Sequence, residues 1–331
     1  MRGIMRIAGL VAPLAVLAAF TMAASAQTEV PAPVAPAAAA GARPAPAMTY
    51  VWAAKPESSP FIAPNRPHWK LAEILSRHAG QKSWSQPVVR DPIGLSAQYI
   101  QMAPGEKTKT MLYADSSIFW VVEAGQIRFT IQGQEPFVAS HNFVVSVPAR
   151  TAFSMETVGD APSLRFEVSH TRSTPLYPIG ETPTPVKGKS YLRTAITGGP
   201  VGYGAGVKPY VDFDKEIMEG GGRAPAGFAH DSETAANLIR GPGVPRPPDS
   251  DPGHFHDGSA EFFFVLDGHL SLLTEGVPFI AAAEPGDVLY APAGRWHRTA
   301  FTGEGMSGRI SIHGIASSLN ILDPEHSAAA Q

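Results

Sequence analysis

The chain has 331 residues, a formal net charge of -3 and no cysteine. At about 150 residues per domain, this length predicts two domains. The small negative charge and the lack of any Lys/Arg block exclude nucleic acid and anionic membrane surfaces as main partners. Without cysteine, neither disulfides nor a lipoprotein acylation site can form. Glycine and proline, at 32 residues each, separate short runs of Val, Ile, Phe and Thr, a pattern that predicts an all-β fold.

The first 26 residues have the three parts of a secretory signal peptide. Two arginines form the positive region, an apolar run covers 7–24, and Ala-Ser-Ala at 24–26 is a small-x-small cleavage site. No charged flank follows that would keep this segment as a membrane anchor. We therefore expect a periplasmic or secreted bacterial protein with no membrane span after cleavage.

The remaining chain is predicted to contain six segments. They are a Pro/Ala-rich disordered spacer at 27–49, an N-terminal extension at 50–87, a first barrel at 88–170, a connection at 171–252, a second barrel at 253–318 and a tail at 319–331. The spacer is too poor in large apolar residues to form a core. In the extension, Leu71, Ile74, Leu75 and His78 are spaced for one face of a short helix that ends at Gly80.

Short apolar runs predict the strands of the first barrel. These strands are 96–102, 118–122, 126–131, 143–147 and 164–168. The connection contains one further expected strand, at 191–196, and a short helix at 212–218. A connection of this length is uncommon unless it lines a site or covers an interface. We therefore expect part of it to cover the second barrel.

The segment 254–297 contains a cluster of residues suited to a metal site. It reads PGHFHDGSAEFFFVLDGHL from residue 252 and, after a short gap, PGDVLYAPAGRWH. His254 and His256 are two residues apart, so on a strand they point to the same face. Glu261 begins the next β-prone run, and His297 follows a Pro-Ala-Gly turn. Three imidazoles and one carboxylate suit one divalent transition metal (Fe, Mn, Ni, Cu or Zn) with one or two positions open.

Glycine and proline residues extend this pattern at fixed spacing. The full set is His254-x-His256, Glu261 and Gly268, followed by Gly286, Pro292-x-Gly294 and His297. It resembles the two-part signature of the cupin superfamily, with Phe301 where the family frequently has Asn. The resemblance implies a double-stranded β-helix, or jelly-roll, barrel that binds metal through the three histidines and the glutamate. The other histidines, such as His269 and His313, lack such surroundings and are expected to be exposed or hydrogen-bonded.

A second copy of the pattern lies upstream and lacks the ligands. Residues 118–133 align without gaps on 261–276, which indicates an internal repeat. In this register the four ligand positions hold Met111, Tyr113, Ile118 and Phe153. The first barrel is therefore predicted to be a degenerate structural barrel, with an apolar ligand pocket as the alternative. The chain as a whole is predicted to be a bicupin: two tandem cupin barrels preceded by an N-terminal extension.

Strand parity predicts which side chains surround the ligands. Phe263 and Val265 should share a face with the glutamate, and Thr299 and Phe301 with the last histidine. This wall is mainly apolar and suits a flat organic substrate or a simply packed interior.

Three larger side chains flank the last ligand. Tyr290, Trp296 and Arg298 could supply a proton donor, a stacking surface and an anion anchor, or they could be structural. The catalytic residues stay unassigned.

The resemblance leaves several functions open. Bicupins similar in architecture include quercetinase-type and gentisate-type dioxygenases, oxalate decarboxylases and pirin-like proteins. We expect a mononuclear metal-dependent oxygenase acting on a small aromatic or other organic substrate. The alternatives are a metal-dependent isomerase or decarboxylase, and a non-catalytic protein that binds a small ligand or has a structural role. Cupin barrels often pair through their sheets, so a homo-oligomer is a further expectation that the sequence does not decide.

Cleavage of the signal peptide can be measured directly. Expressed from Met1 in a bacterial host, the exported protein should begin at Gln27, because small side chains at 24 and 26 fit the cleavage site. N-terminal sequencing and intact mass would detect this. An Ala26→Phe variant should keep its signal segment. A wild-type chain exported with Met1 still present would contradict the prediction.

Overall fold

The computed structural model describes residues 49–224, 228–245, 251–314 and 319–323. The predicted signal peptide and most of the spacer lie outside these ranges. Internal contacts divide the chain into two units, 1–51 and 52–331, and every described strand and helix belongs to the second. Within the described ranges, no helix is long and apolar enough to cross a membrane.

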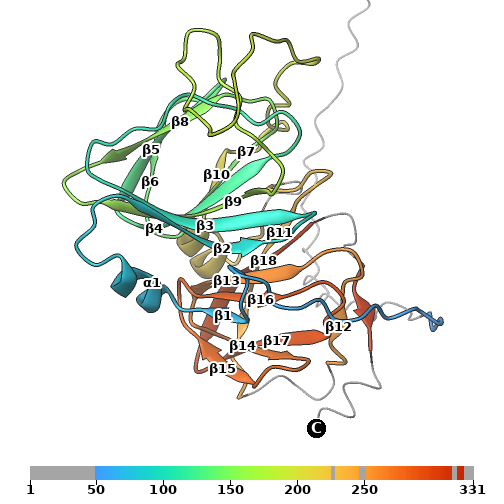
Figure 1. Ribbon diagram of the computed structural model, residues 1–331. Coiled ribbons are helices and arrows are strands. Elements are labelled where there is room, and N and C mark those ends of the chain that lie inside the picture. Colours follow the sequence, from blue (N-terminus) through green and yellow to red (C-terminus); the bar gives the residue numbers. More distant parts are fainter. Residues whose placement is uncertain (1–48, 225–227, 246–250, 315–318, 324–331) are drawn as a thin grey trace, which may run out of the picture. The chain divides into compact units, whose positions relative to one another are not determined.

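The first barrel consists of two antiparallel sheets (Figure 1), ordered β10-β7-β4-β9-β3-β2 and β6-β5-β8. The strand bounds are β2 Trp84–Arg90, β3 Leu95–Met102, β4 Ile118–Ala124, β5 Gln126–Ile131, β6 Phe137–Ala139, β7 Phe143–Val147, β8 Phe153–Val158, β9 Ser163–His170 and β10 Tyr210–Asp212. All five strands expected here are confirmed, and β5 and β7 have the expected bounds. Along β5, exposed and buried residues alternate strictly, as expected for a strand with one face on a core.

The second barrel also has two antiparallel sheets, ordered β1-β16-β13-β18-β11 and β15-β14-β17-β12-β19. The strand bounds are β1 His68–Trp69, β11 Ala235–Pro242, β12 His254–Phe255, β13 Glu261–Asp267, β14 His269–Thr274, β15 Ile280–Ala283, β16 Val288–Ala291, β17 His297–Thr302, β18 Met306–His313 and β19 Ile321–Leu322. Three of these strands come from outside 253–318. β1 belongs to the N-terminal extension, β11 to the connection and β19 to the tail, so distant segments complete this barrel.

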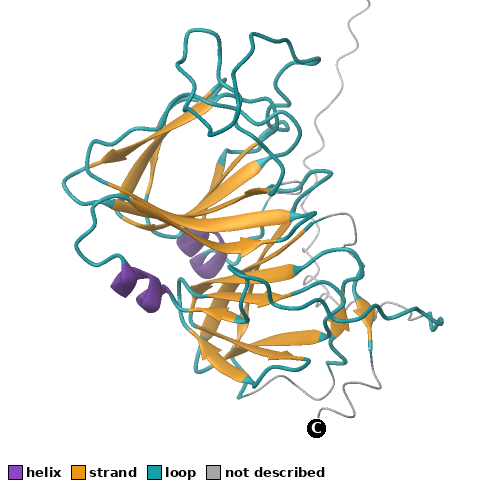
Figure 2. Ribbon diagram, viewed as in Figure 1, coloured by secondary structure: helices purple, strands orange, loops and turns teal. Residues whose placement is uncertain are grey.

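Two short helices accompany the strands (Figure 2): α1 Leu71–Arg77 and the π-helix η1 Phe213–Glu219. The helix expected in the extension is confirmed. It buries Leu71 and Ile74, whereas Leu75, which was expected on the same face, is 41% exposed. The backbone N–H of Leu71 donates to Asp287 Oδ1 at 2.9 Å, which satisfies one free donor of the first turn. α1 is thereby tied to the second barrel.

The strand expected at 191–196 is wrong. This segment has no regular structure, and Tyr191, Leu192 and Ile196 remain 43%, 81% and 44% exposed. An extended segment becomes a strand only when a neighbour pairs with its backbone groups. A run of apolar residues alone could not show that no sheet edge is available here.

The connection joins the two barrels through its strands. β10 pairs with β7 of the first barrel, and β11 pairs with β18 of the second along its whole length. We expected part of the connection to cover the second barrel, but these residues extend a sheet in each barrel instead. Residues 246–250, directly before the metal motif, lie outside the described part of the chain.

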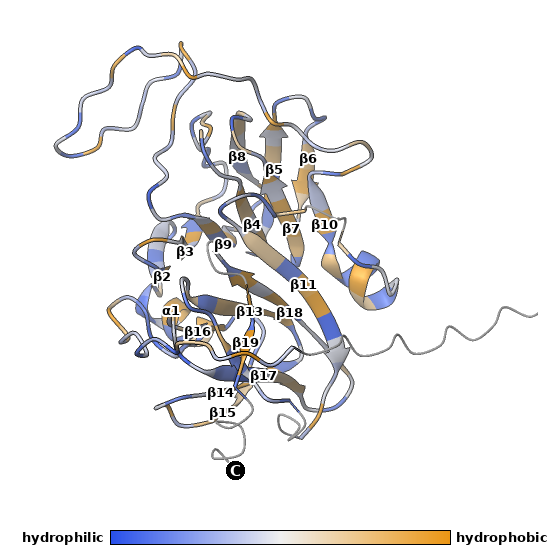
Figure 3. Ribbon diagram, turned by 90° about the vertical axis from the view of Figure 1, so that its right-hand side faces the viewer, coloured by the Kyte–Doolittle hydropathy of each residue, from blue (hydrophilic) through white to orange (hydrophobic). Residues whose placement is uncertain are grey.

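The two barrels share one hydrophobic core. Hydrophobic residues concentrate on the strands of both barrels (Figure 3), and the largest cluster draws on both. Phe264 of β13 lies 4.6 Å from Phe166 of β9 and 6.4 Å from Tyr99 of β3, measured between ring centroids. The Tyr99 hydroxyl also donates a hydrogen bond to the backbone carbonyl of Gly286 in the second barrel. Packing against the first barrel therefore stabilises the strand that begins with Glu261.

Removal of the Phe264 ring should destabilise the whole protein. Phe264 is fully buried between the barrels, so Phe264→Ala should lower the free energy of unfolding by about 3–5 kcal/mol. Urea denaturation followed by tryptophan fluorescence measures this. Phe279, which is 44% exposed, provides the matched control, and Phe279→Ala should cost less than about 0.5 kcal/mol. Equal losses in the two variants would show that the shared core is not important for stability.

Candidate metal centre

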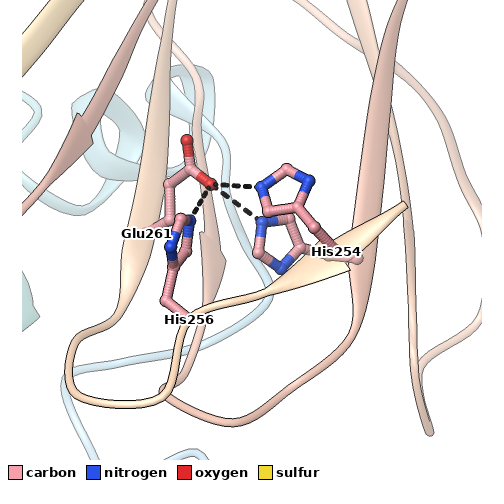
Figure 4. A group of neighbouring side chains, drawn as sticks. His254, His256 and Glu261 are labelled. Carbon is pink, nitrogen blue, oxygen red and sulfur yellow. Dashed lines mark hydrogen bonds and ion pairs between the residues drawn. The ribbon is translucent and has the colours of Figure 1, made fainter. Parts of the chain in front are cut away.

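The predicted ligands meet where three strands of the second barrel begin (Figure 4). His254 lies on β12, Glu261 is the first residue of β13 and His297 is the first of β17. β12 pairs with β17 so that His254 lies directly opposite His297. His256 follows β12, and Figure 4 shows its ring directed at the Glu261 carboxylate. The four residues separated by up to 43 positions are thus brought together as the sequence predicted.

A glycine allows β12 to approach β17 closely. Gly253 has a φ of 63°, and a Cβ atom there would lie 2.5 Å from the Trp296 indole. No other residue fits this position without displacing the tryptophan. The two histidines of β12 and β17 therefore depend on this glycine for their spacing.

The spacing of the donor atoms suits a single metal ion. Glu261 Oε2 lies 2.8 Å from His297 Nε2, 2.9 Å from His256 Nε2 and 3.3 Å from His254 Nε2. All four donor atoms lie within 4.8 Å of one another. Around an ion with ligand distances of about 2.1 Å, neighbouring donors are separated by about 3.0–3.4 Å in octahedral or tetrahedral geometry. The observed separations are close to these values.

In two of the three imidazole rings, the contact made by Nδ1 determines whether Nε2 carries a hydrogen. His256 Nδ1 lies 3.2 Å from the Leu319 carbonyl, and His297 Nδ1 lies 3.0 Å from the Arg295 carbonyl. A carbonyl only accepts, so each Nδ1 carries a hydrogen and each neutral ring has a lone pair at Nε2. These lone pairs face the Glu261 carboxylate, an arrangement that is repulsive unless a cation lies between them.

Protonation of the two rings would be the other way to remove the repulsion. The side chains of His256 and His297 retain only 1% and 2% of their accessible surface. Two buried imidazolium ions around one carboxylate would leave an uncompensated buried charge, which is costly. Backbone carbonyls that orient the imidazoles are instead the usual outer contacts of a metal site. The donor set therefore fits a bound cation.

The carboxylate of Glu261 is held in its ionised form. Burial by itself raises the pKa of this carboxyl, but the surrounding imidazoles of His254, His256 and His297 hold the pKa well below its usual range. The other oxygen, Oε1, accepts a hydrogen bond from the hydroxyl of Ser311. Both carboxylate oxygens are therefore engaged, and the group carries the negative charge that a divalent cation requires.

The ligand set is accessible on one side. The side chain of His254 retains 21% of its accessible surface, against 6% for Glu261 and no more than 2% for the other two histidines. Protein atoms therefore enclose three of the four ligands. An open coordination position would lie on the side of His254.

The wall of the barrel interior follows the predicted parity. Phe263 and Val265 belong to the interior cluster of the second barrel, against which Phe301 packs. The Phe263 ring meets the His297 ring edge-on, with centroids 6.0 Å apart. The ligands are thus bordered by an apolar, aromatic surface.

The three residues that flank His297 face away from the ligands. Tyr290 belongs to the core between the barrels, where burial raises the pKa of its phenol. The Trp296 indole donates to the Pro252 carbonyl at 3.0 Å, and Arg298 donates to the Asp251 carbonyl at 3.0 Å. These contacts fix the segment before β12. The structural alternative is therefore supported for all three, and the roles of proton donor, stacking surface and anion anchor are not.

Sequence reasoning missed the contribution of β18 to the site. Arg309, Ser311 and His313 alternate along this strand and face the same side as Glu261. His313 stacks on His256 with ring centroids 5.2 Å apart, and burial lowers the pKa of His313. Extending the internal repeat to the last strand would have aligned 164–168 with 308–312 and drawn attention to Arg309.

The four equivalent positions of the first barrel also come together. Ile118 and Phe153 belong to one buried cluster, and Met111 and Tyr113 pack against it. Tyr113 and Phe153 stack with centroids 6.4 Å apart. Where the second barrel has ligands, the first has a packed apolar core, which supports the structural reading over a ligand pocket.

Comparison with known proteins identifies the fold. Residues 246–312 match the family Cupin domain. A salicylate 1,2-dioxygenase from Pseudaminobacter salicylatoxidans has a similar structure, with a TM-score of 0.50, 12% identity, and coverage of 80% of this chain and 85% of that one. A variant of oxalate decarboxylase from Bacillus subtilis gives a TM-score of 0.45 and 13% identity, covering 78% of this chain and 79% of that one. No curated protein matches the chain. At these identities the likeness shows the fold alone.

The hydroxyl of Ser311 should tune the affinity of the site. Ser311→Ala removes the hydrogen bond that orients Glu261, so affinity for a divalent metal should fall about 10- to 100-fold with the fold unchanged. Competition with a fluorescent chelator would measure this. The control is Ser271→Ala, since Ser271 is equally buried in this barrel but donates to the Ala300 carbonyl. Unchanged affinity in Ser311→Ala would contradict the prediction.

Proposed function

Because this chain is a bicupin of the cupin superfamily, we propose that its second barrel is the active site of a mononuclear metal-dependent oxygenase. His254, His256, Glu261 and His297 bind one Fe, Mn, Ni, Cu or Zn ion. The substrate is a small, flat organic molecule. The observation that carries the proposal is the set of Nε2 lone pairs directed at one carboxylate oxygen, held there by backbone carbonyls on Nδ1.

Several residues of the second barrel have distinct roles in the proposed reaction. A bound metal would supply open positions at which O2 and a bidentate organic substrate are held together, or act as a Lewis acid. Glu261 contributes the negative charge, and Ser311 fixes its orientation. Phe263 and Phe301 shield the interior from water and offer flat surfaces to a substrate ring. His254, the most accessible ligand, lies on the side from which substrate enters.

A dioxygenase on an aromatic acid uses the same two-barrel fold, since the salicylate enzyme is similar over most of both chains. This shows that the fold is compatible with such a reaction, and it identifies neither the reaction nor the substrate of this chain. Two other functions fit the same ligand set. A metal-dependent isomerase or decarboxylase would use the metal without consuming O2, and a non-catalytic protein would bind metal or ligand without turnover.

We also propose that the protein acts in the periplasm or outside the cell, on a small molecule. This rests on the signal peptide predicted for 1–26 and on the low net charge. Association of the barrels into a homo-oligomer belongs to the same proposal, because cupin sheets often pair.

Metal analysis of the mature protein, purified without chelator, tests the ligand assignment. We expect about one transition-metal ion per chain, with most of it lost in His256→Ala because a buried ligand is removed. His269→Ala is the matched control, since His269 is an exposed histidine on β14 of the same barrel. No metal above background after reconstitution, or equal metal in all three proteins, would defeat the assignment.

Oxygen consumption separates the proposed function from its alternatives. With metal bound, an oxygen electrode should record substrate-dependent uptake for a member of a panel of catechols, flavonols and hydroxybenzoates. Uptake should disappear in His256→Ala and persist in His269→Ala. Conversion of a panel member without uptake would favour the isomerase or decarboxylase. Metal without any turnover would favour the binding protein.

A further inference from the structure

A positively charged side chain lies inside the metal barrel. Arg309 is opposite Val265 on β13 and two residues from Ser311 on β18. Its guanidinium carbon lies 5.0 Å from the Phe263 ring centre and 5.5 Å from that of Phe301. Both rings belong to the interior wall, so the charge is directed between the two sheets.

The charge of Arg309 has no close counter-ion among the described residues. Its Nη1 donates to the Thr299 hydroxyl, while its Nε is buried without a hydrogen-bond partner. Among the residues that the structure describes, no carboxylate oxygen lies within 4.0 Å of its nitrogens. Burial lowers the pKa of Arg309, an effect that the more distant charges of Glu261 and Asp251 oppose. A guanidinium stays protonated even so, and an unpaired buried charge costs free energy.

The first barrel has the same arginine with its counter-ion. Arg165 on β9 is opposite Val122, which the internal repeat aligns with Val265. Arg165 Nε, like Arg309 Nε, is buried without a hydrogen-bond partner, but it lies 3.9 Å from Glu167 Oε2, and Nη1 lies 2.9 Å from the Met102 sulfur. The position of Glu167 is occupied in the second barrel by Ser311, whose hydroxyl serves the ligand Glu261. The barrel with the metal ligands is therefore the one whose arginine lacks an internal carboxylate.

We propose that Arg309 binds the carboxylate of the substrate, so that the metal barrel takes an organic acid with a flat apolar body. The inference rests on the proposed function and specifies its substrate class. Thr299 holds one edge of the guanidinium and leaves the Nε edge for a paired hydrogen bond to a carboxylate. The side chains of Arg309, Thr299 and Phe301 are half-buried, whereas the Arg309 Nε itself is buried, so the carboxylate would have to enter the barrel to reach it.

The spacing allows one molecule to contact both Arg309 and the ligand set. Two residues along a strand span about 7 Å, which is the separation between Arg309 and Ser311, the residue bonded to Glu261. Phe263 contacts both the His297 ring and the Arg309 guanidinium. A ring lying along Phe263 with its carboxylate at Arg309 would place its far end at the ligands. Arg309 is then a binding residue that orients the substrate.

Benzoate and its neutral isostere benzamide are suitable probes. Titration calorimetry on the wild-type protein should show benzoate binding at least about tenfold tighter than benzamide. Arg309→Lys keeps the charge but loses the planar fork, and it should weaken benzoate about tenfold or more. Arg309→Met should weaken it about 30-fold or more. Neither variant should change metal content or benzamide affinity.

The first barrel supplies the matched control. Arg165→Lys makes the same change at the equivalent strand position beside Glu167, and it should leave benzoate affinity within about twofold of wild type. Circular dichroism and thermal unfolding establish that each variant is folded. No benzoate binding to wild type, equal affinity for the two probes, or equal weakening by both lysine variants would overturn the inference.

The inference and the proposed function can fail separately. The titrations are repeated on protein stripped of metal with a chelator, where Arg309 should still favour benzoate over benzamide. A protein that never binds metal but shows this preference would defeat the proposed function and keep the carboxylate site. A metal-loaded protein without Arg309-dependent benzoate binding would defeat the carboxylate site alone.

Discussion

The alternation of side chains along β13 is the constraint on which the rest of the structure depends. Phe262 and Phe264 enter the core shared with the first barrel, while Glu261, Phe263 and Val265 face the interior of the second. A shift of one residue would exchange these two sets, placing the carboxylate in the shared core and a phenylalanine at the ligands. Burial of Phe262 and Phe264 thus fixes the register of β13, and this register determines which side chains face the interior of the second barrel. The core between the barrels is in this sense part of the metal centre.

The two halves of the repeat have diverged in what their interiors contain. In the first barrel, apolar side chains fill the ligand positions, and the buried Arg165 has Glu167 beside it. In the second barrel, the interior contains a carboxylate shared by three imidazoles and an arginine with no carboxylate oxygen within 4.0 Å in the described part of the chain. A packed, neutralised interior stabilises a fold, whereas uncompensated polar groups reduce stability unless a ligand satisfies them. Packing against the first barrel therefore stabilises the second and offsets the loss of stability that its buried polar groups cause.

Prediction from the sequence succeeded where local rules apply. The motif spacing identified all four converging residues, and period-two alternation placed Phe263 and Val265 in the interior. It failed where a contact depends on distant segments. Nothing local shows that 191–196 has no sheet edge to pair with, or that β1 and β11 complete the second barrel. Arg298 adjoins a ligand, which left an anion anchor and a structural role both open, and adjacent residues on a strand face opposite sides.

The sequence by itself determined the fold class, the repeat and the ligand set, because turn glycines, strand periodicity and metal-ligand types are local properties. Only the tertiary structure decided which charges are neutralised. Arg165 and Arg309 occupy the same strand position. The sequence shows Glu167 and Ser311 two residues further on, but not that Glu167 lies 3.9 Å from Arg165 while Ser311 is hydrogen-bonded to Glu261. The same holds for the imidazole hydrogens of His256 and His297, which are fixed by carbonyls of other segments. The electrostatic surroundings of a side chain are set by several strands at once. Only the assembled strands therefore show that the first barrel has a packed interior and the second a candidate binding site.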